Sequence, residues 1–296
     1  MPARAAEPRL LLTAPHYTEG CVVDSDANLY FSQTAASTIL VVPLAAFERG
    51  EPAAAEVRTW AHVAAANGHA IARDGTHFVA ASVGAFLQLD AAGRTLRVLA
   101  THLAEQWLVY PNDVVIDPQR GGCWYTDSGY KATPASPQPD GKGRICRVDA
   151  AGNVSLAASG LQYANGIALT PDGRRLLVGE SVTSRVWSYA IEDGARLGVR
   201  TLFAELPRAP GAVQVPDGIT IDAHARVFIA HYGAGEVLVY GGNGGLVARL
   251  PAGNRAVSHV ALAPDGQRAY ASGGIESERG EGAIFELDLS ALPPAV

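Results

Sequence analysis

Apolar and polar residues alternate along most of this chain in short runs, a pattern typical of β-strands with one buried face. The pattern recurs six times in one order: a small polar residue, an alternating run, an Asp/Gly turn and a second alternating run. The segment NGIALTPDGRRLLVGES, which begins at Asn165, is a clear example. Two alternating runs joined by a short Asp-Gly segment are typical of a β-hairpin. The sequence therefore predicts six hairpins.

The six hairpins belong to a longer repeat. Each is followed by a third alternating run, such as STILVVPL or GEVLVYG, and most by a fourth, such as GRTLRVLATHL. Four strands per repeat, at a spacing of 41 to 53 residues, are typical of propeller blades. We therefore predict an all-β, six-bladed β-propeller with four antiparallel strands per blade, forming one domain over residues 1–296. Two stacked sandwiches, the alternative architecture, would not require a uniform repeat. The repeats begin at Glu19, Asn67, Asn112, Asn165, Asp217 and Ser258.

The last repeat lacks its fourth strand. After Leu289 only SALPPAV remains, which is too short and too rich in proline to form one, whereas RLLLT (Arg9 to Thr13) precedes the first repeat. We predict that this N-terminal strand completes the last blade. Closing the ring in this way would remove exposed sheet edges, which are a general liability of β-structure.

The first residue of each repeat forms a candidate ion site. The innermost strand of every blade begins at the same mouth of the central channel, so these six residues should form a ring there. Two carboxylates and several carboxamides are hard oxygen donors, which suit Ca²⁺, Mg²⁺ or Mn²⁺. Each Asn or Asp taken alone is also typical of a turn. Recurrence in phase, and the presence of Glu19, which is not a turn former, favour metal binding.

Composition narrows the classes of function. The net charge is -6 and the chain has no run of Lys or Arg, which argues against a nucleic-acid partner. Its apolar stretches are too short to cross a bilayer and its N-terminus lacks a signal-peptide core, so we expect a cytoplasmic protein without membrane contact. Three cysteines without a CxxC motif argue against disulfides and against a zinc-cysteine site. The chain contains no GxSxG motif, so the sequence does not support a covalent acyl-enzyme.

Four motifs resemble the gluconolactonase, regucalcin and senescence marker protein family. They are TEGCVVD, YPNDVVIDPQRGGCWYTDSGY, YANGIALTPDGRRLLVGES and VPDGITIDAHARVFIAH, in this order across nearly the whole chain. The resemblance implies that one divalent cation is bound by Glu19, Asn112, Asn165 and Asp217, and that Asp217 also acts as general base. We expect Ca²⁺, with Mg²⁺, Mn²⁺ or Zn²⁺ as alternatives.

From this site we predict a metal-dependent hydrolase that opens a small lactone. The lactone would be of the sugar type or another cyclic ester. The ion would polarise the carbonyl and orient a water, while Asp217 accepts the proton of that water. Fold similarity alone leaves other functions open. They are an aryl-ester or phosphotriester hydrolase, a biosynthetic non-hydrolytic enzyme, and a binding propeller without catalysis. We expect a small-molecule substrate and a monomer or weak homo-oligomer.

Loops at the same mouth should contact the substrate. The loop from Ser128 to Gly143 is a candidate lid that carries Lys131, although a solvated connector has the same composition. Two departures from the family also bear on the site: a thiol, Cys21, follows the Glu-Gly pair, and Tyr110 replaces an Arg that binds substrate hydroxyls. We therefore expect a substrate less polar than gluconolactone. The expected substrate contacts are Asn67, His69, Tyr110, Tyr130, His231 and His259; for His69 and His259, a core position is the alternative.

Overall fold

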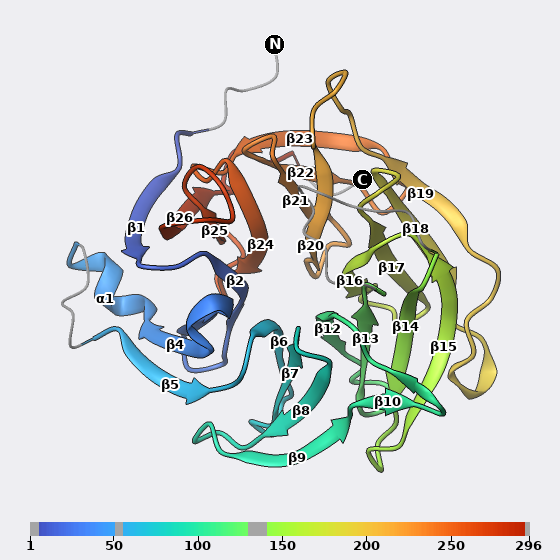
Figure 1. The fold of residues 1–296 in the computed structure, drawn as a ribbon. Coiled ribbons are helices and arrows are strands. Elements are labelled where there is room, and N and C mark those ends of the chain that lie inside the picture. Colours follow the sequence, from blue (N-terminus) through green and yellow to red (C-terminus); the bar gives the residue numbers. More distant parts are fainter. Residues whose placement is uncertain (1–5, 51–55, 130–140, 294–296) are drawn as a thin grey trace.

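The structure is a computed structural model that describes residues 6–50, 56–129 and 141–293. Within these ranges the chain forms six four-stranded antiparallel sheets arranged around a central axis (Figure 1). The predicted six-bladed propeller is therefore confirmed. The innermost strands contact one another in ring order and begin at one mouth of the channel. They are β2 (Thr18–Val23), β6 (Ala66–Ile71), β12 (Pro111–Ile116), β16 (Ala164–Leu169), β20 (Val215–Ile221) and β24 (Ala256–Leu262).

Each blade continues outward through three more strands. The second strands are β3 (Asn28–Gln33), β7 (His77–Ala81), β13 (Cys123–Asp127), β17 (Arg175–Glu180), β21 (Val227–Tyr232) and β25 (Arg268–Gly274). The third strands are β4 (Thr38–Pro43), β8 (Ala85–Leu89), β14 (Gly143–Val148), β18 (Arg185–Ala190), β22 (Glu236–Tyr240) and β26 (Gly282–Asp288). The outer strands are β5 (Arg58–His62), β9 (Thr95–Ala100), β15 (Val154–Leu161), β19 (Thr201–Glu205), β23 (Leu246–Pro251) and β1 (Arg9–Ala14).

A few short elements lie outside the blades. They are a two-stranded hairpin formed by β10 (His102–Leu103) and β11 (Gln106–Trp107), the helix α1 (Leu44–Glu48), and two turns of 3₁₀ helix, η1 (Thr34–Ala36) and η2 (Asp193–Ala195).

The N-terminal strand closes the ring, as predicted. β1 pairs antiparallel with β26, so the last blade combines the two ends of the described chain (Figure 1). Arg9 lies opposite Glu286 and forms an ion pair with it at 3.0 Å. The last sheet is thereby completed to four strands, and β1 covers the edge of β26 that would otherwise be unpaired.

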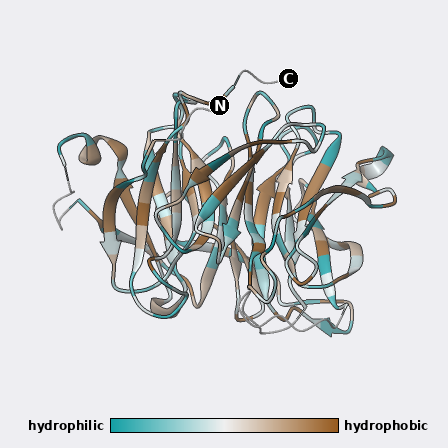
Figure 2. Ribbon diagram, turned by 90° about the horizontal axis from the view of Figure 1, so that it is seen from above, coloured by the Kyte–Doolittle hydropathy of each residue, from teal (hydrophilic) through white to brown (hydrophobic). Residues whose placement is uncertain are grey.

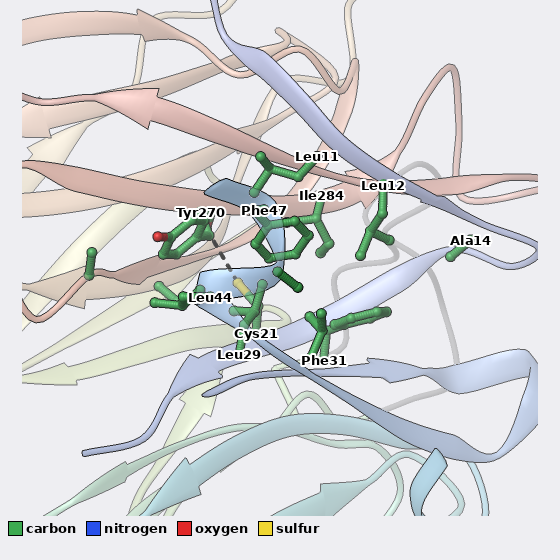
Figure 3. Close-up of a cluster of buried hydrophobic side chains, with 14 residues drawn as sticks. Leu11, Leu12, Ala14, Cys21, Leu29, Phe31, Leu44, Phe47, Tyr270 and Ile284 are labelled. Carbon is green, nitrogen blue, oxygen red and sulfur yellow. Dashed lines mark hydrogen bonds between the residues drawn. The ribbon is translucent and has the colours of Figure 1, made fainter. Parts of the chain in front are cut away.

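Apolar side chains fill the space between neighbouring blades. Viewed edge-on, hydrophobic residues follow the strands through the thickness of the ring, while many connecting loops are hydrophilic (Figure 2). Between the first and last blades, for example, Leu29 and Phe31 pack with Tyr270 and Ile284 (Figure 3). Burying each such large side chain contributes about 1.5–3 kcal/mol. Packing between blades therefore holds the inner strands together around the axis.

All six residues of the predicted ring lie within the inner strands and not in turns. At this point each inner strand carries a bulge or irregularity in its pairing with the second strand. A bulge redirects the side chain of the extra residue. A glycine follows Asn165 because the position has no room for a side chain. A Cβ at Gly166 would lie 2.2 Å from the Asp217 carbonyl oxygen on the next blade. The Asn-Gly and Asp-Gly pairs thus mark close contact between inner strands.

Candidate functional site

A cavity of about 320 Å³ lies at the mouth where the inner strands begin. Glu19, Asn112 and Asp217 line it together, although they are far apart in the chain. Each side chain is placed there by its own blade, because the ring residue is the second or third residue of every inner strand. The residues that line the cavity are Tyr17, Glu19, Thr34, Ala35, Asn67, Tyr110, Asn112, Tyr163, Asp217, Glu278 and Arg279.

Two buried oxygens at this mouth have no hydrogen-bond partner. The Asn165 side chain is fully buried and its Nδ2 donates to Ser181 Oγ at 3.0 Å, but its Oδ1 accepts nothing from the described residues. The same holds for Oδ2 of Asp217. Buried acceptors without a donor are unfavourable and rare in folded proteins. A bound cation would provide the missing interaction for both oxygens.

The carboxyl groups here are hard to ionise. Burial raises the pKa of Glu19 to about 7, with the opposing effect of His259 too small to reverse this shift. The pKa of Asp217 is well above its ordinary value because of burial and of repulsion from Glu19, while a hydrogen bond from Asn165 acts in the opposite direction. Two buried carboxyls that repel each other are typical of ion-binding and catalytic sites.

The donor set fits a hard cation that also uses neutral oxygens. Among the described residues no group of three or more His, Cys, Asp or Glu side chains is placed to hold a metal ion. An ion at Glu19 and Asp217 would therefore depend on the carboxamides of Asn112 and Asn165. Carboxylate and carboxamide oxygens are the ligands that Ca²⁺ and related ions prefer.

Acidic residues on neighbouring strands fix the backbone next to the ring. Asp127, at the end of β13, accepts the N–H of Tyr110 at 2.7 Å and forms an ion pair with Arg144. Glu180, at the end of β17, accepts the N–H of Gln162 at 2.9 Å. The segments that enter β12 and β16 are thus held by charge-assisted hydrogen bonds, which are stronger than neutral ones.

A second pair of charged groups lies one residue further along the inner strands. His259 Nε2 is 3.5 Å from Asp113 Oδ1, and the two residues belong to β24 and β12, which face each other across the ring. Burial alone would lower the pKa of His259, but Asp113 raises it well above its ordinary value. Asp113 was not among the residues predicted from the sequence. The available signal was that Asp113 stands where the Asn165 and Asp217 repeats carry Gly166 and Gly218.

The expected substrate contacts fall in different places. Asn67 and Tyr110 line the mouth cavity. His69 and His259 instead line a separate cavity of about 450 Å³ together with the far ends of the inner strands. His231 is not among the residues that line the mouth cavity; its Nδ1 lies 3.0 Å from Glu236 Oε1. Tyr130, with Lys131 in the same loop, lies outside the described residues.

The environment of His69 is that of a core residue. Its Nε2 lies 2.8 Å from Nδ1 of His77, and the two rings pack with Trp60 and Tyr30 between the first two blades. Burial lowers the pKa of both histidines, so the pair is neutral near pH 7. This arrangement corresponds to the core alternative considered for the histidines.

Cys21 also points away from the mouth cavity. Its thiol donates to the Tyr270 carbonyl oxygen at 3.5 Å within the cluster between the first and last blades (Figure 3). The thiol therefore does not line the mouth cavity, although its Sγ lies 3.8 Å from Nδ1 of His259.

Two tyrosines in the cavity lining were missed. Tyr17 and Tyr163 stand two residues before Glu19 and Asn165, as Tyr110 stands before Asn112. The recurring signal was YTE, YPN and YAN at the start of three repeats.

A separate finding concerns membranes: none of the helices in the described ranges is long and apolar enough to span a bilayer.

The fold and the site together define a six-bladed propeller with an acidic, oxygen-rich cavity at one mouth. Residues 17–272 match the family described as SMP-30/Gluconolactonase/LRE-like region. The chain belongs to this family, as the four motifs indicated.

Several curated relatives are lactonases. The chain is 29% identical to pentonolactonase XacC from Haloferax volcanii over 61% of this chain and 62% of the relative. It is 26% identical to the gluconolactonase of Zymomonas mobilis over 70% of this chain and 60% of the relative. It is also 26% identical to lactonase drp35 from Staphylococcus saprophyticus over 88% of this chain and 78% of the relative. The chain thus spans about three fifths of the length of the first two relatives.

Solved structures show the same fold. A gluconolactonase from Xanthomonas campestris superimposes with a TM-score of 0.75 at 21% identity, covering 99% of this chain and 97% of that one. The calcium-binding protein regucalcin from Agrobacterium tumefaciens gives a TM-score of 0.76 at 21% identity, covering 96% and 93%. At these identities the likeness establishes the propeller architecture.

Proposed function

We propose that this protein is a metal-dependent hydrolase that opens a small lactone. The observation that carries the proposal is the pair of unpartnered buried oxygens, Asn165 Oδ1 and Asp217 Oδ2, beside the Glu19 carboxyl. Lactonases among the curated relatives support the reaction class. A calcium-binding structural neighbour supports a divalent ion.

Glu19, Asn112, Asn165 and Asp217 are the proposed ligands. We propose Ca²⁺ as the ion because the set consists of oxygens only, half of them neutral. Mg²⁺, Mn²⁺ and Zn²⁺ are the alternatives. When bound, a divalent cation would polarise the lactone carbonyl and offset the repulsion between the two carboxylates.

Hydrolysis forms a bond between the oxygen of water and the carbonyl carbon, and breaks the ring C–O bond to give a hydroxy acid. Asp217 is the proposed general base: it lines the cavity and would accept the proton that the attacking water loses. The same carboxyl would then return the proton to the departing ring oxygen.

The test combines metal analysis with a substrate panel. Purified protein is assayed for bound metal, and a panel of lactones is screened by proton release before and after treatment with a chelator. We expect hydrolysis that is lost on chelation and restored by one divalent ion. Activity on aryl esters or phosphotriesters with none on lactones would replace the proposed reaction, and ion binding without any hydrolysis would indicate a binding propeller. Activity that is unaffected by complete metal removal would contradict metal dependence.

A further inference from the structure

Three tyrosines line the mouth cavity, and two of them are neighbours. Tyr17, Tyr110 and Tyr163 all line it, each from the segment that enters an inner strand. The rings of Tyr110 and Tyr163 lie side by side, with centroids 6.4 Å apart and planes tilted by 43°. The partly exposed ring of Tyr110, supported by the buried ring of Tyr163, offers a surface on which a flat apolar group can pack.

The backbone of this aromatic surface is fixed before any ligand binds. The N–H of Tyr110 donates to Asp127 at 2.7 Å, and its carbonyl accepts the N–H of Ser128 at 2.9 Å. The carbonyl of Tyr163 likewise accepts the N–H of Ser181 at 3.1 Å. Tyr163 is also almost completely buried, at 1% exposure. A surface held in this way loses little conformational entropy on binding.

Three polar side chains at the same mouth each direct a hydrogen toward the protein. Asn67 Nδ2 donates to Ser82 Oγ at 3.0 Å, and Thr34 Oγ1 donates to the Ala66 carbonyl at 2.8 Å. Asn165 Nδ2 is similarly occupied by Ser181. A polyhydroxy lactone would lose water from several hydroxyls on entering, and the hydrogens that these three groups direct to the protein do not replace that water. Unpaired buried hydroxyls oppose binding.

We propose that Tyr110 and Tyr163 determine specificity by selecting lactones that carry an aromatic or other flat apolar substituent over polyhydroxy sugar lactones. The cavity of about 320 Å³ is near the lower end of ligand-site volumes, which suits a molecule with one or two rings. This inference rests on the proposed lactonase function. It deepens that function by naming the class of substrate.

The test compares three five-membered lactones whose leaving group is in each case an alkoxide: γ-phenyl-γ-butyrolactone, γ-methyl-γ-butyrolactone and ribono-1,4-lactone. Each kcat/KM is divided by the rate of alkaline hydrolysis, which removes differences in intrinsic reactivity. We expect the phenyl lactone to exceed the methyl lactone by about tenfold, the effect of a modest hydrophobic contact, and ribono-1,4-lactone to be the poorest. A preference for ribono-1,4-lactone would overturn the proposal.

Variants assign the preference to the two rings. Tyr110→Ala should raise KM for the phenyl lactone about tenfold and reduce the preference over the methyl lactone, whereas Tyr110→Phe should retain it. Because Tyr163 is buried, Tyr163→Leu is used beside Tyr163→Ala, and thermal melts identify any variant that fails to fold. Trp107→Ala is the matched control, since Trp107 is 71% exposed and does not line the cavity. An equal loss for all three lactones in the Tyr110→Ala variant would contradict a specificity role.

Direct binding separates this inference from the proposed reaction. Calorimetry measures the dissociation constants of the phenyl lactone and of ribono-1,4-lactone for the intact protein. One outcome is that no lactone is hydrolysed, the phenyl lactone binds more tightly, and Tyr110→Ala removes the difference. The proposed hydrolysis would then be wrong, and the proposed role of the aromatic surface in binding would be supported. Hydrolysis without any preference for the phenyl lactone would instead support the reaction and overturn the role of the aromatic surface.

Discussion

The two ends of the central channel are built from the same six strands and have opposite chemistry. Where the inner strands begin, the cavity is lined by carboxyl, carboxamide and phenol groups. Where the strands end, a larger cavity of about 450 Å³ is lined mainly by aliphatic side chains, including Ile71, Ile116, Leu169 and Ile221. The difference shows that volume alone does not identify the site. Unpartnered oxygens and carboxyl groups that resist ionisation mark only the first mouth as suited to an ion and a reacting ester.

The largest expected effect comes from changing the proposed base. Asp217→Asn keeps an oxygen but removes the proton acceptor, so kcat/KM for the best lactone should fall by about a thousandfold. Steady-state kinetics at saturating Ca²⁺ provides the measurement. In the presence of a chelator the same variant should be more stable than the wild type, because the repulsion between Asp217 and Glu19 is removed. Wild-type activity in this variant would show that Asp217 is not the general base.

A second prediction concerns the contact between inner strands. Gly166→Ala places a Cβ 2.2 Å from the Asp217 carbonyl oxygen, and backbone on both sides must shift. We expect a loss of about 2–4 kcal/mol in the free energy of unfolding, together with weaker Ca²⁺ binding. Denaturant titration and calorimetry measure the two effects. Gly242→Ala serves as control, because its Cβ would meet its nearest neighbours at an ordinary 3.5 Å.

The third prediction uses the titration of the mouth cavity. Glu19 has an ordinary pKa of 4.5 and a pKa of about 7 in the folded protein. Between these values the unfolded chain has lost the proton that the folded chain keeps, so stability falls as pH rises. His259, whose folded pKa is raised, acts in the same direction. Urea denaturation of metal-free protein between pH 5 and pH 8 should therefore show decreasing stability.

The control for this pH dependence is Glu19→Gln, which should reduce the slope of the profile and leave the contributions of His259 and Asp217. Saturating Ca²⁺ should reverse the decrease near neutral pH, because the ion favours the ionised carboxylates. Metal-free protein whose stability increases steadily over the same interval would show that Glu19 is not held protonated by its surroundings.

The smallest effect is expected at the far mouth. Ile221→Val removes one methylene group from the wall of the aliphatic cavity and should cost about 0.5–1.5 kcal/mol of stability. Lactone kinetics and Ca²⁺ affinity should remain at wild-type values. A strong change in either, without unfolding, would mean that the two mouths are functionally coupled.

Much of the architecture could be predicted because its signals are local and repeated. Alternation of period two identified the strands, and the in-phase repeats identified the blades and the ring residues from Glu19 to Ser258. The orphan run from Arg9 predicted closure because the last repeat lacked a strand. Tyr17 and Tyr163 were available from the same phase, two residues before their ring positions, but were overlooked.

The directions of individual side chains could not be predicted from the sequence. Cys21 and His69 stand two residues after ring positions, yet neither lines the mouth cavity: Cys21 packs in the cluster between the first and last blades, and His69 pairs with His77. Asp113 and His259 meet across the channel although 145 intervening residues separate them in the sequence. Neither arrangement follows from a local pattern.

By itself, the sequence determined the number of blades, the closure by the N-terminal strand and the identity of the residues at the head of each repeat, because hydrophobic alternation and turns act over a few residues. Only the tertiary structure decided which oxygens lost their partners, which carboxyls repel and which tyrosines face each other. Those properties depend on distances between blades, and the physical cause of each, burial or a neighbouring charge, exists only once the ring has closed.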